Sequence, residues 1–323
     1  MKLVKNFFIT INSKGFFVTL NAIKNFLIIL INNFFSFSKL IKKKIFNFEM
    51  YLDPKDRGIS RTLLLFGNRE LDHKIILETV LKKDMKIFDI GANIGYYVLM
   101  QSKLIGKKGK ILAVEPVRKN MKLLKKNLEL NKNNITRTIQ VAVTNKKKFK
   151  KFNGSEIFYT TSHSNIGRLD NKIKNDKNKK FITSTLYLER LIKDNFNPDL
   201  IRMDIEGSEV DILNDLTDIK LKKYPTICFE THISQYLLRN KNNNLPKMDK
   251  TLRKMFKIGY RVRFASTSYE LGSKKLKKLG YKPFYKNIKT DDVNREIYMN
   301  LKNKDALKLI CYEGGLRTIL MSR

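Results

Sequence analysis

Cysteine is scarce in this sequence. The chain of 323 residues has only two, Cys228 and Cys311, and neither has a further Cys or His at the spacing of a zinc finger. A zinc finger is therefore not expected. We predict that both cysteines are small core residues of a protein in a reducing compartment, which makes the cytoplasm the expected location.

Long apolar runs are missing as well. The longest uncharged stretch of the first fifty residues, 25–38, has 14 residues and includes Asn32 and Asn33. A membrane-spanning helix needs about 20 apolar residues, so none is expected here. No cleavage site of small residues follows the apolar run, which argues against a signal peptide.

The first fifty residues are nevertheless rich in aromatic and aliphatic side chains, and three lysines, Lys42 to Lys44, follow these side chains. This combination is typical of a helix that lies on an anionic membrane. The same amphipathic pattern would also suit a helix that packs on the main domain or on a second subunit. We predict residues 1–50 to be a basic, hydrophobic N-terminal extension, and both roles, peripheral membrane contact and packing, stay open.

Acidic residues are outnumbered by basic ones. There are 30 Asp and Glu against 66 Lys and Arg, which gives a formal charge of +36. A charge of this size usually suggests nucleic acid or an anionic membrane as a partner. Most of the excess is lysine spread over the whole chain, whereas arginine, which suits bidentate contacts with phosphate and guanine, is the minority. A specific nucleic-acid partner is therefore not expected.

Strands and helices alternate from about residue 84, which specifies an α/β, Rossmann-like fold: a mostly parallel twisted sheet with helices on both faces. We predict one domain over 51–323, with a core at about 75–235 and a C-terminal part, 236–323, that completes the sheet and the substrate side. The expected strands are 86–91, 110–116, 135–143, 200–204, 226–231, 261–265 and 309–312; the expected helices are 94–105, 118–131 and 209–216, and 145–180 is expected to hold loop with an irregular hairpin.

A loop with two glycines joins the first strand of this unit to the first helix. Gly91 and Gly95 allow a tight turn, and the helix beyond them offers free N–H groups and the positive end of its dipole. In dinucleotide-binding folds this place holds a pyrophosphate. Here the third glycine of that motif is missing and Asp89 precedes Gly91 by two residues. The pattern favours a ligand without phosphates, whose amino-acid portion carries an ammonium and a carboxylate; a plain turn is the alternative.

Glu115 ends the second strand, 24 residues after Gly91. A carboxylate at this position can accept hydrogen bonds from both ribose hydroxyls of a bound nucleoside. The alternative is an exposed charge at the end of a strand. Together with the glycine loop, Glu115 predicts a cofactor that contains adenosine.

Three acids, Asp204, Glu206 and Glu209, follow the fourth strand. They are expected at the same edge of the sheet as the glycine loop, where one of them could be the general base for a substrate hydroxyl. The alternative is that Glu209 caps the following helix and Asp204 organises loops. His232 follows the next strand and is a candidate base or substrate contact, although a lone His is more often structural. The acids have no clear metal-ligand spacing, so no metal is expected.

Four segments together, DIGANIG at 89–95, AVEP at 113–116, IRMDIEGSE at 201–209 and CFETH at 228–232, resemble the FkbM-type methyltransferase family. The resemblance covers about residues 50–235. It implies a class I methyltransferase fold and the transfer of a methyl group from S-adenosylmethionine to oxygen, typically to a hydroxyl of a sugar, glycan or secondary metabolite. Beyond about residue 235 the resemblance fades, so it does not identify this small-molecule or glycan acceptor.

The resemblance also implies roles by position. Arg202 stands where the family usually has Lys, which preserves the charge but could alter the contacts made there. The family's methionine-side cofactor loop would be Asp89, Gly91, Asn93 and Gly95, its ribose acid Glu115, and its acidic motif Asp204, Glu206 and Glu209.

Three other functions remain open at this stage. The basic charge keeps an RNA or DNA methyltransferase as an alternative, although no Asn-Pro-Pro-Tyr-like motif follows the fourth strand and the Asn197–Pro198 pair precedes it. A nicotinamide-dependent oxidoreductase would need the third glycine that is missing here. A membrane-bound scaffold without activity would not need Asp89, Glu115 and the acids of the fourth strand.

Overall fold

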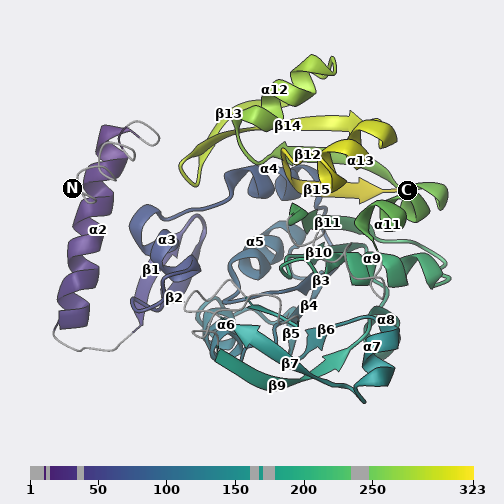
Figure 1. The fold of residues 1–323 in the computed structure, drawn as a ribbon. Coiled ribbons are helices and arrows are strands. Elements are labelled where there is room, and N and C mark those ends of the chain that lie inside the picture. The colour runs from purple at the N-terminus through teal and green to yellow at the C-terminus, as the bar shows by residue number, and fades with distance from the viewer. Residues whose placement is uncertain (1–10, 12–14, 35–39, 161–166, 170–178, 234–246) are drawn as a thin grey trace.

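The computed structural model describes residues 11, 15–34, 40–160, 167–169, 179–233 and 247–323. Its centre is a nine-stranded sheet with the order β13-β14-β12-β15-β11-β10-β3-β4-β5 (Figure 1). Five neighbouring strands are parallel to one another. These are β3 (Lys86–Ile90), β4 (Lys110–Val114), β5 (Thr136–Ile139), β10 (Leu200–Met203) and β11 (Thr226–Glu230).

The C-terminal part extends this sheet with four antiparallel pairings. Only β14 and β15 oppose the others, so seven of the nine strands run in one direction. The strands are β12 (Arg261–Thr267), β13 (Tyr285–Thr290), β14 (Val293–Leu301) and β15 (Leu316–Ser322). The prediction of a mostly parallel sheet is confirmed.

Helices cover both faces of the sheet, as the sequence predicts. In β3, Ile87 packs in one core cluster with Val98 and Leu124, whereas Phe88 packs on the opposite face with Leu213. One face carries α4 (Leu71–Val80), α5 (Tyr96–Ile105) and α6 (Arg118–Leu130), and the other carries α8 (Leu188–Asp194), α9 (Glu209–Asp218), α11 (Met248–Lys257) and α13 (Asn303–Cys311); α12 (Glu270–Lys278) packs near β14. Cys228 and Cys311 are both buried and unpaired.

Two of the expected strands are wrong. Leu309 to Cys311 are the buried last residues of helix α13 and Tyr312 follows its end, because a short apolar run does not distinguish a helix from a strand. The expected strand 135–143 divides in two: β5 ends at Ile139, and β6 (Ala142–Val143) pairs with β9 instead. The second, four-stranded sheet has the order β6-β9-β7-β8, with β7 (Ser155–Thr160), β8 (Gly167–Arg168) and β9 (Lys179–Leu186); α7 (Lys146–Lys151) precedes it. Within 145–180, where an irregular hairpin is expected, β7 pairs antiparallel with β8, whereas β9, which also pairs with β7, lies mostly beyond that range.

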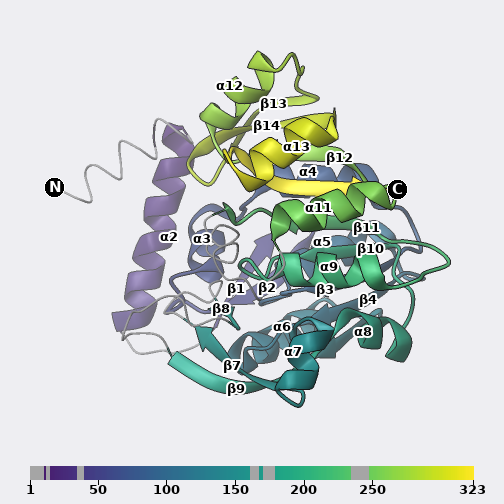
Figure 2. The same ribbon diagram turned by 45° about the vertical axis from the view of Figure 1, so that its right-hand side comes forward.

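The N-terminal residues form a helix and a hairpin. Helix α2 (Phe16–Phe34) lies beside α3 (Ile59–Phe66) at the edge of the molecule in both views (Figures 1 and 2). β1 (Ile41–Ile45) and β2 (Phe48–Leu52) form a hairpin that spans residue 50, the predicted end of the N-terminal extension. The Tyr51 N–H in this hairpin donates a hydrogen bond to the Asn127 Oδ1 of α6 at 2.7 Å. Among the residues described, no helix has the length and apolar character needed to cross a membrane.

Candidate functional site

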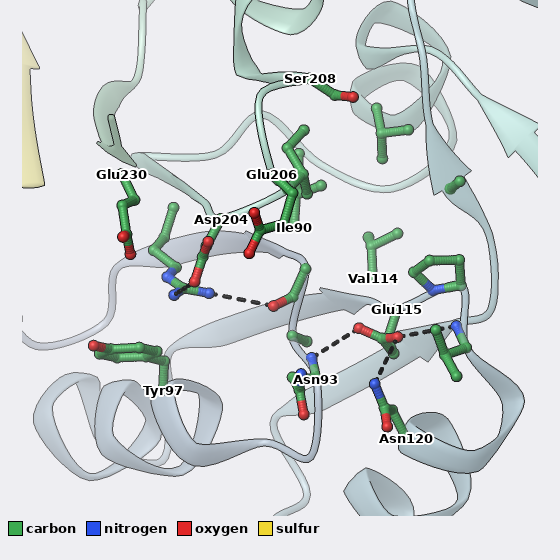
Figure 3. A pocket seen from close by; sticks show the side chains of 18 of the residues that line it. Ile90, Asn93, Tyr97, Val114, Glu115, Asn120, Asp204, Glu206, Ser208 and Glu230 are labelled. Atoms are coloured by element: carbon green, nitrogen blue, oxygen red, sulfur yellow. Dashed lines mark hydrogen bonds and ion pairs between the residues drawn. The ribbon is translucent and has the colours of Figure 1, made fainter. Parts of the chain in front are cut away.

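A cavity of about 990 Å³, counted with its part open to solvent, lies at the carboxyl ends of the parallel strands. The strand order reverses here, because β4 and β5 lie on one side of β3 while β10 and β11 lie on the other. Ligands of open α/β sheets bind at this kind of crevice. Figure 3 shows Glu115 and Asn120 at one end of the cavity and Asp204, Glu206 and Glu230 at the other.

The glycine bend after β3 lies between two neighbouring strand ends. The N–H groups of Gly91 and Ala92 donate hydrogen bonds to the Val114 carbonyl at 2.9 and 3.0 Å. Gly91 has a φ of +84°, and a Cβ atom there would lie 2.2 Å from the Asp204 carbonyl oxygen. Only glycine fits this conformation and this close approach. Gly95 begins α5 and packs against Leu124 outside the cavity lining.

Glu115 points at the bend from the end of β4 (Figure 3). Its Oε2 accepts a hydrogen bond from the Asn93 N–H at 2.9 Å, and its Oε1 accepts bonds from the Val117 N–H at 2.9 Å and the Asn120 Nδ2 at 3.2 Å. Burial raises the pKa of Glu115 to about 7, although these donors oppose the shift. The structure thus brings together the acid and the bend that the sequence singles out.

Asp89 lies behind the bend. It is fully buried and is not among the described residues that line the cavity. Its carboxylate accepts hydrogen bonds from the Gln101 Nε2 at 2.8 Å and the Arg202 Nη1 at 3.2 Å. The same Arg202 nitrogen donates to the Gly91 carbonyl at 3.3 Å. Within this structure Asp89 supports the bend through Arg202.

The three acids and His232 meet at the other end of the site. Asp204 and Glu206 line the cavity, whereas Glu209 and His232 lie behind them. The His232 Nε2 is 3.6 Å from the Asp204 Oδ1 and 3.5 Å from the Glu209 Oε1, and the Nδ1 is 3.8 Å from the Glu206 Oε2. The sequence expectation that these side chains share one edge of the sheet agrees with this geometry.

These charges shift one another's pKa values. Burial opposes protonation of His232, but Glu209, Asp204 and Glu206 raise its pKa to about 10. Burial favours the neutral form of Asp204, yet His232 and Arg202 hold its pKa well below the ordinary value. The surrounding acids therefore favour the protonated form of His232 at neutral pH.

Several polar residues of the cavity were not found from the sequence. The Arg317 Nη2 donates hydrogen bonds to Glu70 Oε1 at 2.9 Å and Glu230 Oε2 at 3.1 Å, and Tyr97 donates to Glu70. Glu230 lies at the end of a parallel strand, as Glu115 does, so its position in the sequence could have predicted that it lines the cavity. Arg317 and Glu70 lie outside the four motif segments and had no such signal.

The lining fits a nucleoside attached to an amino acid. The wall beside Glu115 is apolar, which suits a purine, and the Glu115 carboxylate lies within it to accept hydrogen bonds from hydroxyls. The opposite end carries acids that would attract a cationic group. The apolar residues are Val114, Val117, Val141, Val143 and Phe158.

Comparison with known proteins identifies a family. The family model described as the Methyltransferase FkbM domain matches residues 89–262, just over half of the chain. No curated protein sequence matches the chain.

Solved structures that resemble this chain include M. jannaschii TYW2 in complex with AdoMet, at 12% identity, a TM-score of 0.40 and coverage of 82% of this chain and 88% of that one. The precorrin-6y C5,15-methyltransferase from Geobacter metallireducens GS-15 has 12% identity and a TM-score of 0.39, over 77% of this chain and 88% of that one. A putative O-methyltransferase from Klebsiella pneumoniae has 10% identity and a TM-score of 0.37, over 73% and 82%.

Proposed function

The chain belongs to the FkbM methyltransferase family, and we propose that it methylates a hydroxyl group of a sugar, glycan or secondary metabolite. As a member of this family it is an S-adenosylmethionine-dependent methyltransferase. The nicotinamide-dependent oxidoreductase and the inactive scaffold are therefore not retained. The observation that carries the proposal is the placement of Asp204 and Glu206 at the end of the cavity opposite Glu115.

The bend and the Glu115 end would hold the nucleoside of the cofactor. The Glu115 carboxylate would accept hydrogen bonds from ribose hydroxyls, and the apolar wall formed by Val117, Val141 and Phe158 would cover the base. When bound, S-adenosylmethionine supplies a methyl group on a sulfonium sulfur, which keeps the electron pair of the carbon–sulfur bond as that bond breaks.

The acids at the other end would act on the acceptor. An ionised carboxylate accepts a hydrogen bond from a hydroxyl, so Asp204 and Glu206 can aim the acceptor oxygen along the cavity. As that oxygen forms its bond to carbon, its proton leaves to a carboxylate of this wall. General-base help of this kind contributes about 10²–10⁴-fold to a rate. His232, whose protonated form the surrounding acids favour, would hold these acids in place.

The test is turnover of the Asp204→Asn variant in a screen of sugars, glycans and hydroxylated metabolites with a labelled methyl donor. We expect kcat to fall by about 10²-fold or more, because the variant keeps the shape of the side chain and loses its charge. S-adenosylmethionine affinity, measured by calorimetry, should change little.

Asp199→Asn is the matched control, since Asp199 lies next to the opposite end of β10, where Lys223 pairs with it at 2.6 Å. This variant should keep full turnover. Unchanged turnover in Asp204→Asn would remove Asp204 from the mechanism. Methyl transfer to RNA or DNA, with none to hydroxylated small molecules or glycans, would replace the proposed acceptor class.

We further propose that α2 contacts an anionic membrane. Thr19, Ala22 and Ile29 are buried, while a stripe of apolar side chains on the opposite side of the helix is exposed. Lys42 and Lys44 of β1 are exposed and add positive charge in the N-terminal part of the chain, although Lys42 pairs with Glu49 at 3.0 Å. The stripe is formed by Phe17, Leu20, Leu27, Ile31 and Phe34. Binding of the purified chain to vesicles measures this contact directly.

A further inference from the structure

Three side chains of types that bind metal ions meet behind the cavity wall: Asp204, Glu209 and His232. One ligand atom of each lies within 4.8 Å of the others. Asp204 and Glu209 belong to the loop after β10 and the start of α9, and His232 follows β11, the strand beside β10. The sequence shows no ligand spacing because the pairing of two strands, and not one motif, brings the residues together.

Two atoms of this cluster are buried without hydrogen bonds. Glu209 is fully buried, and within the described part of the chain its Oε2 has no hydrogen-bond partner, while its Oε1 accepts a bond from the Ile205 N–H at 2.8 Å. The His232 Nε2 is buried and has no hydrogen-bond partner among the same residues either. Buried polar groups are normally paired, so both atoms point to a group that binds between them.

The distances in the cluster suit a shared ion better than hydrogen bonds. The His232 Nε2 is 3.5 Å from the Glu209 Oε1 and 3.6 Å from the Asp204 Oδ1, beyond the usual hydrogen-bond length. Two ligands bound at about 2.1 Å to one ion in tetrahedral to octahedral geometry lie about 3.0–3.4 Å apart. Small movements would therefore close a coordination sphere around an ion.

The other nitrogen of His232 also fits this role. Its Nδ1 faces the Glu206 Oε2 at 3.8 Å. A histidine that binds a metal usually donates its other N–H to a carboxylate, which orients the ring and makes the ligand more basic. Glu206 is in position for this contact.

We propose that Asp204, Glu209 and His232 together bind one divalent transition-metal ion, such as Mn²⁺ or Zn²⁺, at the acceptor end of the cavity. An imidazole with two carboxylates suits these ions, whereas Mg²⁺ and Ca²⁺ prefer ligand sets made only of oxygen. Binding of the ion would release the proton of the His232 Nε2 to solvent, and the ion would take its place in offsetting the negative charge of the surrounding acids.

The inference deepens the proposed function and rests on it for the identity of the acceptor. Asp204 lines the cavity and belongs to the cluster, so an ion bound there would have a coordination position within reach of the acceptor oxygen. A bound ion lowers the pKa of a coordinated hydroxyl. The O–H bond would break with its proton passing to the Glu206 carboxylate, and no strongly basic side chain would then be required.

The test is Mn²⁺ titration of the full chain after treatment with EDTA and dialysis, followed by electron paramagnetic resonance. We expect one Mn²⁺ per chain, competition by Zn²⁺, and nitrogen coupling from the His232 ring in the pulsed spectrum. Glu209→Gln and His232→Ala should each weaken binding by about 10-fold or more. Asp218→Asn, which removes an exposed acid from the same helix, should leave it unchanged.

The wild-type spectrum tests the metal site even if a variant fails to fold. Lack of Mn²⁺ and Zn²⁺ binding, lack of nitrogen coupling, or full affinity in a folded His232→Ala would overturn the metal site. Calorimetry with S-adenosylmethionine on the same preparations separates the two proposals: cofactor binding without metal binding refutes the metal site alone, whereas metal binding without cofactor binding refutes the proposed function alone.

Discussion

At the scale of single residues, Arg202 explains how the two ends of the site stay connected. Its guanidinium bonds to Asp89, to the Gly91 carbonyl and to Asp204, and lies 4.1 Å from the centre of the Tyr97 ring. The ammonium of a lysine could not make these contacts at once, because it is a single point charge on a flexible stem. Arg202 therefore connects the bend to the acids through hydrogen bonds and ion pairs.

We expect Glu115 to make the binding of the cofactor depend on pH. Its pKa of about 7 lies above the ordinary 4.5, so the carboxyl is largely neutral at pH 6 and ionised at pH 8. The ionised form is the better acceptor for ribose hydroxyls. We expect S-adenosylmethionine to bind more tightly as the pH rises through about 7, as measured by calorimetry between pH 6 and pH 8, and Glu115→Gln to lose most of this dependence.

The stability of the cofactor-free protein should change in the opposite direction. The folded state holds the Glu115 proton more firmly than the unfolded state, so folding becomes less favourable as the pH rises from about 4.5 to 7. Glu115→Gln should remove this loss of stability, whereas Glu129→Gln, which changes an exposed acid of α6, should leave it in place. Identical pH profiles of cofactor binding in wild type and Glu115→Gln would contradict the assignment.

At the scale of elements, the cavity residues at the ends of the parallel strands were predictable from the sequence, whereas the cavity residues from other elements were not. The ends of parallel strands meet at one edge of a sheet, so the sequence alone places Glu115, Asp204 and His232 together. Arg317 reaches the same cavity from β15, an antiparallel strand that was not predicted from the sequence. Glu70 reaches it from the start of α4, with no motif to mark it.

The division of the expected strand 135–143 into β5 and β6 was likewise not marked in the local sequence. The segment is rich in β-branched residues on both sides of Gln140. Local propensity therefore cannot tell that the chain leaves one sheet at Ile139 and enters another at Ala142. That transition matters for the site, because Val141 and Val143 line the apolar wall of the cavity. The pairing of β6 with β9, a strand distant in the sequence, determines where the chain enters the second sheet.

The bend between β3 and α5 gives a prediction at this scale. Gly91→Val should abolish S-adenosylmethionine binding in calorimetry, because a Cβ atom would lie 2.2 Å from the Asp204 carbonyl oxygen and push the bend away from β10. Gly280→Val is the matched control: its φ of +85° imposes the same backbone strain, but nothing lies within 4 Å of the added Cβ atom. Normal binding by a folded Gly91→Val would refute the role of the bend.

At the scale of the whole molecule, the cavity is assembled from nearly the full length of the described chain. Its lining runs from Ile59 to Arg317, and the insertion between β5 and β10 adds Phe158 and Leu169. The N-terminal helix α2 is not part of this lining within the described residues, yet it exposes large apolar side chains such as Phe17 and Phe34, each 83% exposed. Its exposed stripe therefore needs an explanation apart from the site.

The proposed contact with an anionic membrane would account for the exposed apolar stripe of α2 together with the charge of +36. We expect the purified chain to sediment with vesicles of phosphatidylcholine and phosphatidylserine, to bind pure phosphatidylcholine less, and to be released by salt. Ile31→Glu should weaken binding by about 10-fold, because it places a charge where an apolar side chain of 55% exposure would enter the membrane. Ile182→Glu, the same change at a 77% exposed site outside α2, should bind as wild type does. A stable dimer in sedimentation that Ile31→Glu dissociates, without vesicle binding, would mean that a second copy of the chain covers the stripe.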